Sequence, residues 1–205
     1  MKKQLLTACV ALCSFAANAQ FWTNQNVPLL YDGYINDMEV VSSNVAWGNT
    51  WNALATTPYT QDFAKTIDGG LTWITGSIGA PAALSISNIW PIDADTCYVS
   101  MWSSPGGAIY KTTDGGGTWN QVGANMFTQP TSFANVVYFF DAANGFAMGD
   151  PSGSPLRYEL YQTSNYGVTW TQVPSANIPP LTNNAEFGIT NLFSAAQGRV
   201  WFGTT

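Results

Sequence analysis

Thr112-Thr113-Asp114-Gly115-Gly116-Gly117-Thr118-Trp119 is the stretch that decides the fold of this chain, because similar stretches occur twice more. The other two copies are Thr66-Ile67-Asp68-Gly69-Gly70-Leu71-Thr72-Trp73 and Thr163-Ser164-Asn165-Tyr166-Gly167-Val168-Thr169-Trp170. The tryptophans that end the three copies are 46 and 51 residues apart. Recurrence at a nearly constant interval predicts a repeat architecture, in which each unit buries its faces against its neighbours.

A second motif marks where each unit begins. An apolar residue, one spacer and an Asp or Asn open an apolar or alternating run, at Asp37, Asn88, Asn135 and Asn191. An aromatic residue follows after 10, 10, 11 and 10 residues, at Trp47, Tyr98, Phe146 and Trp201. Each unit then reads as four short strands separated by turn signals, with no helical periodicity. A four-stranded unit of about 40 to 50 residues has the size of a β-propeller blade.

At these residues the sequence resembles the Asp-box (BNR) repeat proteins, whose motif is Ser/Thr-x-Asp-x-Gly-x-Thr-Trp. The first two copies match it, and the third has Asn165 in place of the aspartate. The wider frame, including residues 140–150, is similar to the photosystem II assembly-factor-like propellers that occur in many secreted bacterial proteins. The resemblance implies an all-β fold, a β-propeller of four-stranded antiparallel blades. It implies no single activity, because this fold hosts many chemistries.

The repeat spacing predicts about three and a half blades. We expect them at residues 35–76, 86–122 and 133–174, with a half blade at 189–205. Residues 21–27 resemble the outer strands that begin at Trp119 and Trp170, which makes them a candidate ring-closing strand. An incomplete ring leaves sheet edges and blade faces exposed, so we expect the sequence to be an N-terminal fragment of a larger protein.

The chemistry of the Asp-box favours a structural role. Its aspartate can accept hydrogen bonds from backbone N–H groups of the turn, its glycine can take a positive φ, and its tryptophan can be buried between sheets. We therefore assign a turn-forming role to Asp68, Gly70, Thr72, Trp73, Asp114, Gly116, Thr118, Trp119, Asn165, Gly167, Thr169 and Trp170.

The first 19 residues read as a secretory signal peptide. Lys2 and Lys3 precede an apolar run, which ends in the small-residue pattern Ala17-Asn18-Ala19. The run is shorter than the roughly 20 residues that a membrane-spanning helix needs, and no later segment is long enough. We expect a protein that is secreted or displayed at the cell surface and does not span the membrane. Removal of the signal peptide would also remove Cys9 and Cys13. The mature protein would then keep one cysteine, Cys97, which lies in an apolar run and has no disulfide partner.

Composition excludes several classes of function. Six Lys and Arg against twelve Asp and Glu give a net charge of -6, which leaves no basic surface for nucleic acid. The chain has no histidine, so His-dependent triads and His-ligated metals are excluded. We expect no cofactor and no metal.

Strand parity divides the loops between two faces of the blades. The loops between second and third strands share a face with the links between blades, and the Asp-box turns lie on the opposite face. The first face carries Trp51, Tyr59, Trp102 and Phe127, which are candidate ligand-binding residues for a polysaccharide or protein partner. The alternative is that these aromatic side chains pack over the blade junctions.

Three functions stay open. The first is a secreted, non-catalytic binding or scaffold module, exported by a system such as the type IX-like one that similar propellers often use. The second is a sialidase-like or xyloglucanase-like glycoside hydrolase, for which Asp37 is a weak catalytic candidate and Glu186 a poorer one. A sialidase-like arginine triad cannot form, because only Arg157 and Arg199 are present. The third is an assembly factor for a membrane protein complex.

Overall fold

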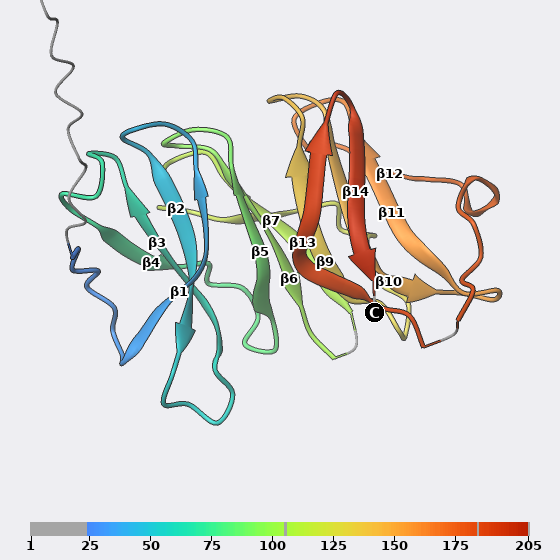
Figure 1. Ribbon diagram of the computed structural model, residues 1–205, viewed down its shortest axis with the longest axis horizontal. Helices are drawn as coiled ribbons and strands as arrows, with labels where there is room; N and C mark the ends of the chain where they lie inside the picture. The colour runs from blue at the N-terminus through green and yellow to red at the C-terminus, as the bar shows by residue number, and fades with distance from the viewer. Residues whose placement is uncertain (1–23, 105, 184, 205) are drawn as a thin grey trace, which may run out of the picture.

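The chain folds into antiparallel β-sheets. The computed structural model describes residues 24–104, 106–183 and 185–204. These residues form three four-stranded sheets and one two-stranded sheet, and the strands of each sheet follow one another in chain order (Figure 1). The prediction of an all-β chain with about three and a half four-stranded units is confirmed. We call the three larger sheets blades 1, 2 and 3.

The strands of the blades have the following bounds. Blade 1 consists of β1 (Gly33–Val40), β2 (Ala46–Asn52), β3 (Tyr59–Thr66) and β4 (Ile74–Ser77). Blade 2 consists of β5 (Ser85–Pro91), β6 (Cys97–Trp102), β7 (Gly107–Thr112) and β8 (Asn120–Val122). Blade 3 consists of β9 (Ala134–Phe139), β10 (Gly145–Ser152), β11 (Arg157–Thr163) and β12 (Thr171–Gln172). A short 3-10 helix (Ser175–Asn177) leads to the hairpin of β13 (Gly188–Ala196) and β14 (Arg199–Thr204).

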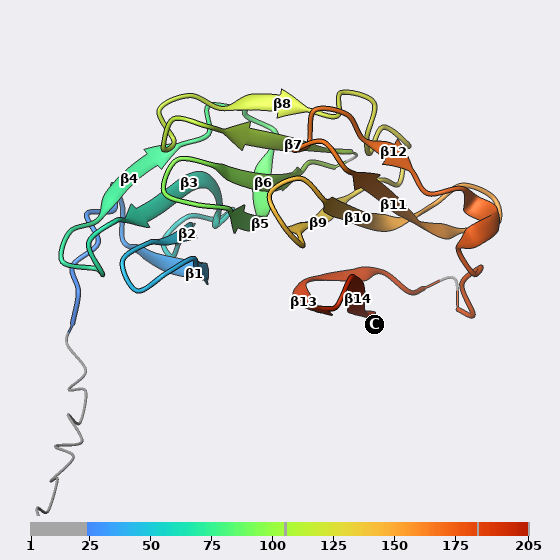
Figure 2. The same ribbon diagram turned by 90° about the horizontal axis from the view of Figure 1, so that it is seen from above.

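The blades are arranged as an arc. Figure 2 shows β4, β8 and β12 along its outer side and β1, β5 and β9 along its inner side, with the β13–β14 hairpin facing the concavity. The inner strands contact one another from blade to blade, and β13 contacts β9. The first strands of the blades therefore line the interior of the arc.

The hydrophobic core lies between neighbouring blades. Trp47 and Phe63 of blade 1 are 0% and 2% exposed and belong to one cluster with Ile89 and Val99 of blade 2. A second cluster joins blade 2 to blade 3 in the same way. Each sheet thus buries its apolar side chains against the next sheet, because a single four-stranded sheet has no other surface against which to bury them.

The Asp-box turn is held by a small hydrogen-bond network. In blade 2 the Asp114 carboxylate accepts hydrogen bonds from the Thr118 N–H (2.8 Å), the Thr118 hydroxyl (2.7 Å) and the Thr112 hydroxyl (2.8 Å). The Thr112 Oγ1 in turn accepts the Gly116 N–H at 3.0 Å. Gly116 has a φ of 92°, and its α-carbon lies against the Phe63 ring of blade 1, so a larger residue would be strained and would clash.

Blade 1 repeats this network, and blade 3 keeps it with an amide. Asp68 accepts from the Thr72 N–H at 2.9 Å and from the Thr72 hydroxyl at 2.6 Å. In blade 3 the Asn165 Oδ1 accepts the Thr169 N–H at 2.9 Å, and its Nδ2 donates to the Thr169 hydroxyl at 2.8 Å. An amide can replace the carboxylate because the threonine hydroxyl is either donor or acceptor.

A lysine on the third strand of blades 1 and 2 contacts the Asp-box turn of the following blade. The Lys65 Nζ donates to the Gly115 carbonyl at 2.7 Å and lies 4.6 Å from the centre of the Trp47 ring. The Lys111 Nζ likewise donates to the Tyr166 carbonyl at 2.9 Å. The tryptophan of the box adds contact area, since the Trp119 ring packs 5.6 Å from the Phe63 ring. The box is therefore both a turn and a junction between blades.

The N-terminal segment contacts the first Asp-box. The Trp73 Nε1 donates to the Gln25 side chain at 3.0 Å, and the Thr75 hydroxyl donates to the Pro28 carbonyl at 3.2 Å. The predicted signal peptide (1–19) lies outside the described residues. So do residues 21–23 of the predicted closing strand (21–27), whose remaining residues form no strand here. Both stay predictions. Among the described residues, no helix has the length and apolar character to cross a bilayer.

The Asp-box network predicts the effect of two matched substitutions. Asp114→Ala should lower the thermal midpoint, because two Thr118 donors and one Thr112 donor lose their acceptor. Asp114→Asn should be close to wild type, since Asn165 already supports the same turn. Thermal unfolding followed by circular dichroism measures both, and an equal loss for the two variants would contradict this interpretation.

The same carboxylate predicts a pH dependence. Hydrogen bonds from Thr118, first its backbone N–H and then its hydroxyl, lower the pKa of Asp114 to about 2. A carboxyl whose pKa is lower in the folded state stabilises the fold above its unfolded pKa, and this contribution disappears as the pH falls through the folded pKa. The thermal midpoint should therefore fall between about pH 4 and pH 2, and less so in Asp114→Asn.

Candidate functional site

Four aromatic side chains meet where the second-to-third-strand loops of blades 1 and 2 converge. Ring centres are 4.9 Å apart for Trp51 and Tyr59, 5.1 Å for Tyr59 and Trp102, and 5.0 Å for Trp102 and Phe133. We call these four residues the aromatic row. Tyr34, which is 51% exposed, extends it by stacking 6.3 Å from Trp51. Three of the four candidate ligand-binding residues thus lie side by side.

A cavity of about 380 Å³ lies against the aromatic row. Its other lining side chains are neutral: Asn36, Asn49, Thr50, Thr60, Ile86, Ser87, Thr190 and Asn191. Asn49 is 3% exposed, and its Oδ1 has no hydrogen-bond partner among the described residues. An unpaired buried acceptor is unfavourable, so Asn49 brings an unsatisfied amide oxygen to the lining of this cavity.

Phe127 does not belong to this site, contrary to the prediction. It is 1% exposed, and its ring packs 5.1 Å from the Tyr161 ring in the core between blades 2 and 3. Gly149 makes room for it, because a side chain at Gly149 would overlap the Phe127 ring. Its loop has the expected place in the chain, but the side chain turns inward and can contact no surface ligand.

Sequence reasoning missed Phe133 and Asn49. Phe133 holds the apolar position two residues before Asn135, where the other units have isoleucine. The aromatic residue at that position was a signal that could have been used. Asn49 had no such signal, because only the packing of blade 1 shows that its amide oxygen lacks a partner.

Asp37 lies apart from the aromatic row, on β1, which is one of the strands that line the interior of the arc. It lines a second cavity, of about 290 Å³, with Glu39, Trp90, Tyr138 and residues of β13. Burial, followed by the charge of Asp37, raises the pKa of Glu39 to about 7. Burial also raises the pKa of Asp37. Glu186, the other carboxylate considered, accepts a hydrogen bond from the Thr182 hydroxyl and lines neither cavity.

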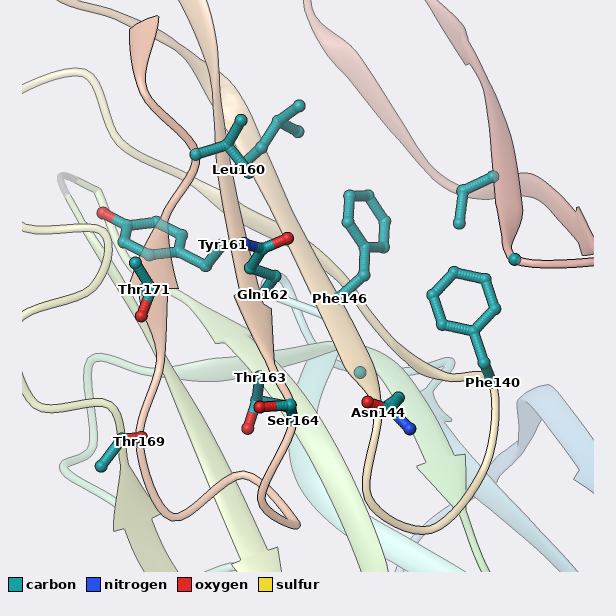
Figure 3. Close-up of a pocket in the computed structure, with 14 residues that line it drawn as sticks. Phe140, Asn144, Phe146, Leu160, Tyr161, Gln162, Thr163, Ser164, Thr169 and Thr171 are labelled. Atoms are coloured by element: carbon teal, nitrogen blue, oxygen red, sulfur yellow. The ribbon is translucent and has the colours of Figure 1, made fainter. Parts of the chain in front are cut away.

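A third cavity, of about 520 Å³, lies on the face of blade 3 that is turned away from blade 2. Phe146, Leu160 and Gln162 line it, and the sheet register makes them equivalent to Trp47, Phe63 and Lys65 of blade 1. Figure 3 shows Phe140 and Phe146 between blade 3 and the β13–β14 hairpin. On blades 1 and 2 the Asp-box turn of the next blade covers the equivalent surface. On blade 3 no such turn is present among the described residues, and the cavity lies at that surface.

The described residues include no group of three or more His, Cys, Asp or Glu side chains placed to hold a metal ion.

Comparison with known proteins supports the fold. No protein-family model matches the chain. No curated protein matches it either. Among solved structures, YCF48 from Cyanidioschyzon merolae is similar, with a TM-score of 0.57 and 14% identity over 84% of this chain and 48% of that chain. The chain thus spans about half of that protein, and the similarity shows a shared propeller fold.

Two further structures are similar at lower scores. One is described as YCF48 bound to D1 peptide, with a TM-score of 0.49 and 16% identity over 73% of this chain and 41% of that chain. The other is a GH74 xyloglucanase from Xanthomonas campestris, with a TM-score of 0.45 and 20% identity over 63% of this chain and 19% of that chain.

The third cavity predicts unequal costs for two equivalent substitutions. Phe63→Ala should cost about 3 to 5 kcal/mol of unfolding free energy, because Phe63 is buried under Trp119 of the next blade. Leu160→Ala should cost less than about 2 kcal/mol, since its side chain borders an open cavity. Urea unfolding measures both, and equal costs would show that the blade 3 face is as well packed as the junctions.

Proposed function

We propose that the chain is an exported, non-catalytic recognition module of a bacterial surface or extracellular protein, and that it binds a neutral polysaccharide along the aromatic row. One observation carries the proposal. The aromatic row borders a cavity whose other lining residues are uncharged, and one of them, Asn49, has a buried Oδ1 without a partner among the described residues. Export is supported by the signal-peptide pattern of residues 1–19.

The chemistry of the cavity fits a sugar better than an ion. Aromatic rings provide apolar faces for the C–H groups of a pyranose, and amide and hydroxyl groups exchange hydrogen bonds with its hydroxyls. The lining residues carry no charge, and the chain has a net charge of -6, which disfavours polyanions. Exposed rings such as Tyr59, at 48%, leave contact area for a chain longer than one sugar.

A protein ligand is the second candidate at the same place. The row extends to Tyr34, and Tyr and Trp are common anchors of protein interfaces. A hydrolase would require two carboxylates that flank the scissile bond, one of them as the proton donor. The residues that line this cavity include neither Asp nor Glu. The catalytic candidate Asp37 lies with Glu39 in another cavity, which no ring of the aromatic row lines. We therefore favour binding over glycoside hydrolysis at the aromatic row, and an assembly factor would use the row as a protein-binding surface.

The test is a set of matched tryptophan variants. Binding to soluble neutral glucans, xylans and mannans is measured by isothermal titration, with charged polysaccharides as comparison ligands. Trp102→Ala and Trp51→Ala should each weaken binding about fivefold or more, which corresponds to the loss of about 1 kcal/mol expected for an anchor. The control is Trp201→Ala, which removes an exposed tryptophan, 57% accessible, that does not line the cavity.

Three results would contradict the proposal. Equal binding by wild type and both cavity variants would remove the aromatic row from recognition. Binding of a protein but no polysaccharide would favour the second candidate. Release of reducing ends that disappears in Asp37→Asn would show an enzyme.

A further inference from the structure

The inner strands form a pocket with two carboxylates and three aromatic rings. Asp37, Glu39, Trp90, Tyr138 and Phe193 line the cavity of about 290 Å³ described above, which we call the channel pocket. It lies on the inner side of the arc, where β1, β5 and β9 face the β13–β14 hairpin (Figure 2). It shares only Asn191 with the lining of the aromatic-row cavity.

The sheet register explains why these side chains meet. Glu39 pairs with Trp47, Trp90 with Tyr98 and Tyr138 with Phe146. Each of the three aromatic partners holds the same place in its own blade. Glu39, Trp90 and Tyr138 are therefore equivalent residues on successive inner strands and lie at one level of the channel.

The three rings form an apolar wall. The Trp90 and Tyr138 ring centres are 4.4 Å apart, and the Phe193 ring from β13 lies 5.6 Å from Tyr138 and 6.1 Å from Trp90. The face of an aromatic ring is electron-rich and attracts organic cations.

The carboxylates lack a positive partner. The titratable side chains on β1, β5, β9 and β13 are Tyr34, Asp37, Glu39 and Tyr138, so none of them is basic. The Asp37 Oδ2 is buried and accepts no hydrogen bond from the described residues. A buried carboxylate oxygen without a donor is costly. The Met38 backbone N–H stabilises the Asp37 carboxylate in part, and no basic side chain on these strands compensates its charge.

The other units show that architecture does not require this charge. At the position of Asp37 blade 2 has Asn88, whose Oδ1 accepts the Val137 N–H of blade 3 at 3.0 Å. Blade 3 has Asn135, which donates to the Asp150 carboxylate at 2.7 Å. An amide therefore makes a hydrogen bond between blades at Asn88 and one within the blade at Asn135, and only the first unit has a carboxylate at this position.

We propose that the channel pocket binds a primary ammonium group. The Asp37 and Glu39 carboxylates would accept its N–H donors, and the rings of Trp90, Tyr138 and Phe193 would contact its charge and the attached methylene groups. Carboxylate acceptors favour an ammonium with N–H groups over a quaternary one, which has no N–H to donate. A divalent metal fits less well, because it prefers several oxygen ligands, and the described residues include no group of three or more His, Cys, Asp or Glu side chains placed to hold one.

The ammonium group has two sources, a free alkylamine or the side chain of a lysine. A pH effect accompanies both. The pKa of Glu39 is raised to about 7 by burial and by the charge of Asp37, so Glu39 is partly protonated near neutral pH. Only its ionised form attracts a cation, so binding should be tighter at about pH 8 than at about pH 6, and the bound cation should lower the pKa of Glu39.

The test uses three probes of similar size. Binding of n-butylammonium chloride is followed at about pH 8 by isothermal titration and by the NMR shift of the Trp90 indole N–H. We expect saturable binding of n-butylammonium, weaker binding of tetramethylammonium and no binding of neutral n-pentanol. A blocked alanyl-lysyl-alanine peptide distinguishes the sources: tighter binding of the peptide indicates lysine, and tighter binding of the amine indicates a free alkylamine.

Charge-neutral variants locate the site. Asp37→Asn and Glu39→Gln should each weaken binding about tenfold or more, as expected for the loss of a charge-assisted hydrogen bond. Asp37→Asn introduces the residue that the equivalent positions already carry, so it should fold. The control, Asp32→Asn, removes the same charge from an exposed residue outside the pocket and should leave binding unchanged.

The outcomes are decisive in both directions. The proposal is overturned if n-butylammonium does not saturate the wild-type protein, if n-pentanol binds equally well, or if binding survives in both carboxylate variants. It is also overturned if Asp32→Asn weakens binding as much as Asp37→Asn, because the effect is then one of net charge.

Discussion

The structure depends on the contact between the Asp-box turn of one blade and the lysine of the preceding blade. The Lys65 Nζ is withdrawn from water, which lowers its pKa, and donates to the Ala94 and Gly115 carbonyls over the face of Trp47. A buried ammonium must be compensated in this way, so the turn has to lie at one place on the neighbouring sheet. Because Lys111 repeats the contact, successive sheets take the same relative position.

That regular stacking creates both candidate sites. It brings the second-to-third-strand loops of blades 1 and 2 together on one face, so that Tyr59 meets Trp102 across the junction. It also brings equivalent inner-strand residues to one level, so that Glu39 lies near Trp90 and Tyr138. The candidate sites thus lie at the junctions between blades, where equivalent positions of neighbouring repeats carry different side chains.

The two sites differ in the charge that they offer. The aromatic-row cavity is neutral and carries an unpaired amide oxygen at Asn49, whereas the channel pocket carries two carboxylates without a basic partner. Blade 1 contributes to both, through β2 and β1. The two proposed ligands, a neutral sugar and an ammonium group, match this difference in charge, and the two proposals rest on different lining residues apart from Asn191.

The sequence by itself determined the fold, because the Asp-box turn is a local structure. Asp114 and its threonines lie within seven residues of one another, and hydrogen bonds over so short a span can be inferred from spacing. The aromatic row was predictable in part for the same reason, since strand parity places Trp51, Tyr59 and Trp102 on one face. Only the tertiary structure decided that Phe127 turns into the core and that Asn49 lacks a partner. Burial and hydrogen-bond satisfaction depend on side chains from other blades, and spacing along one chain does not report them.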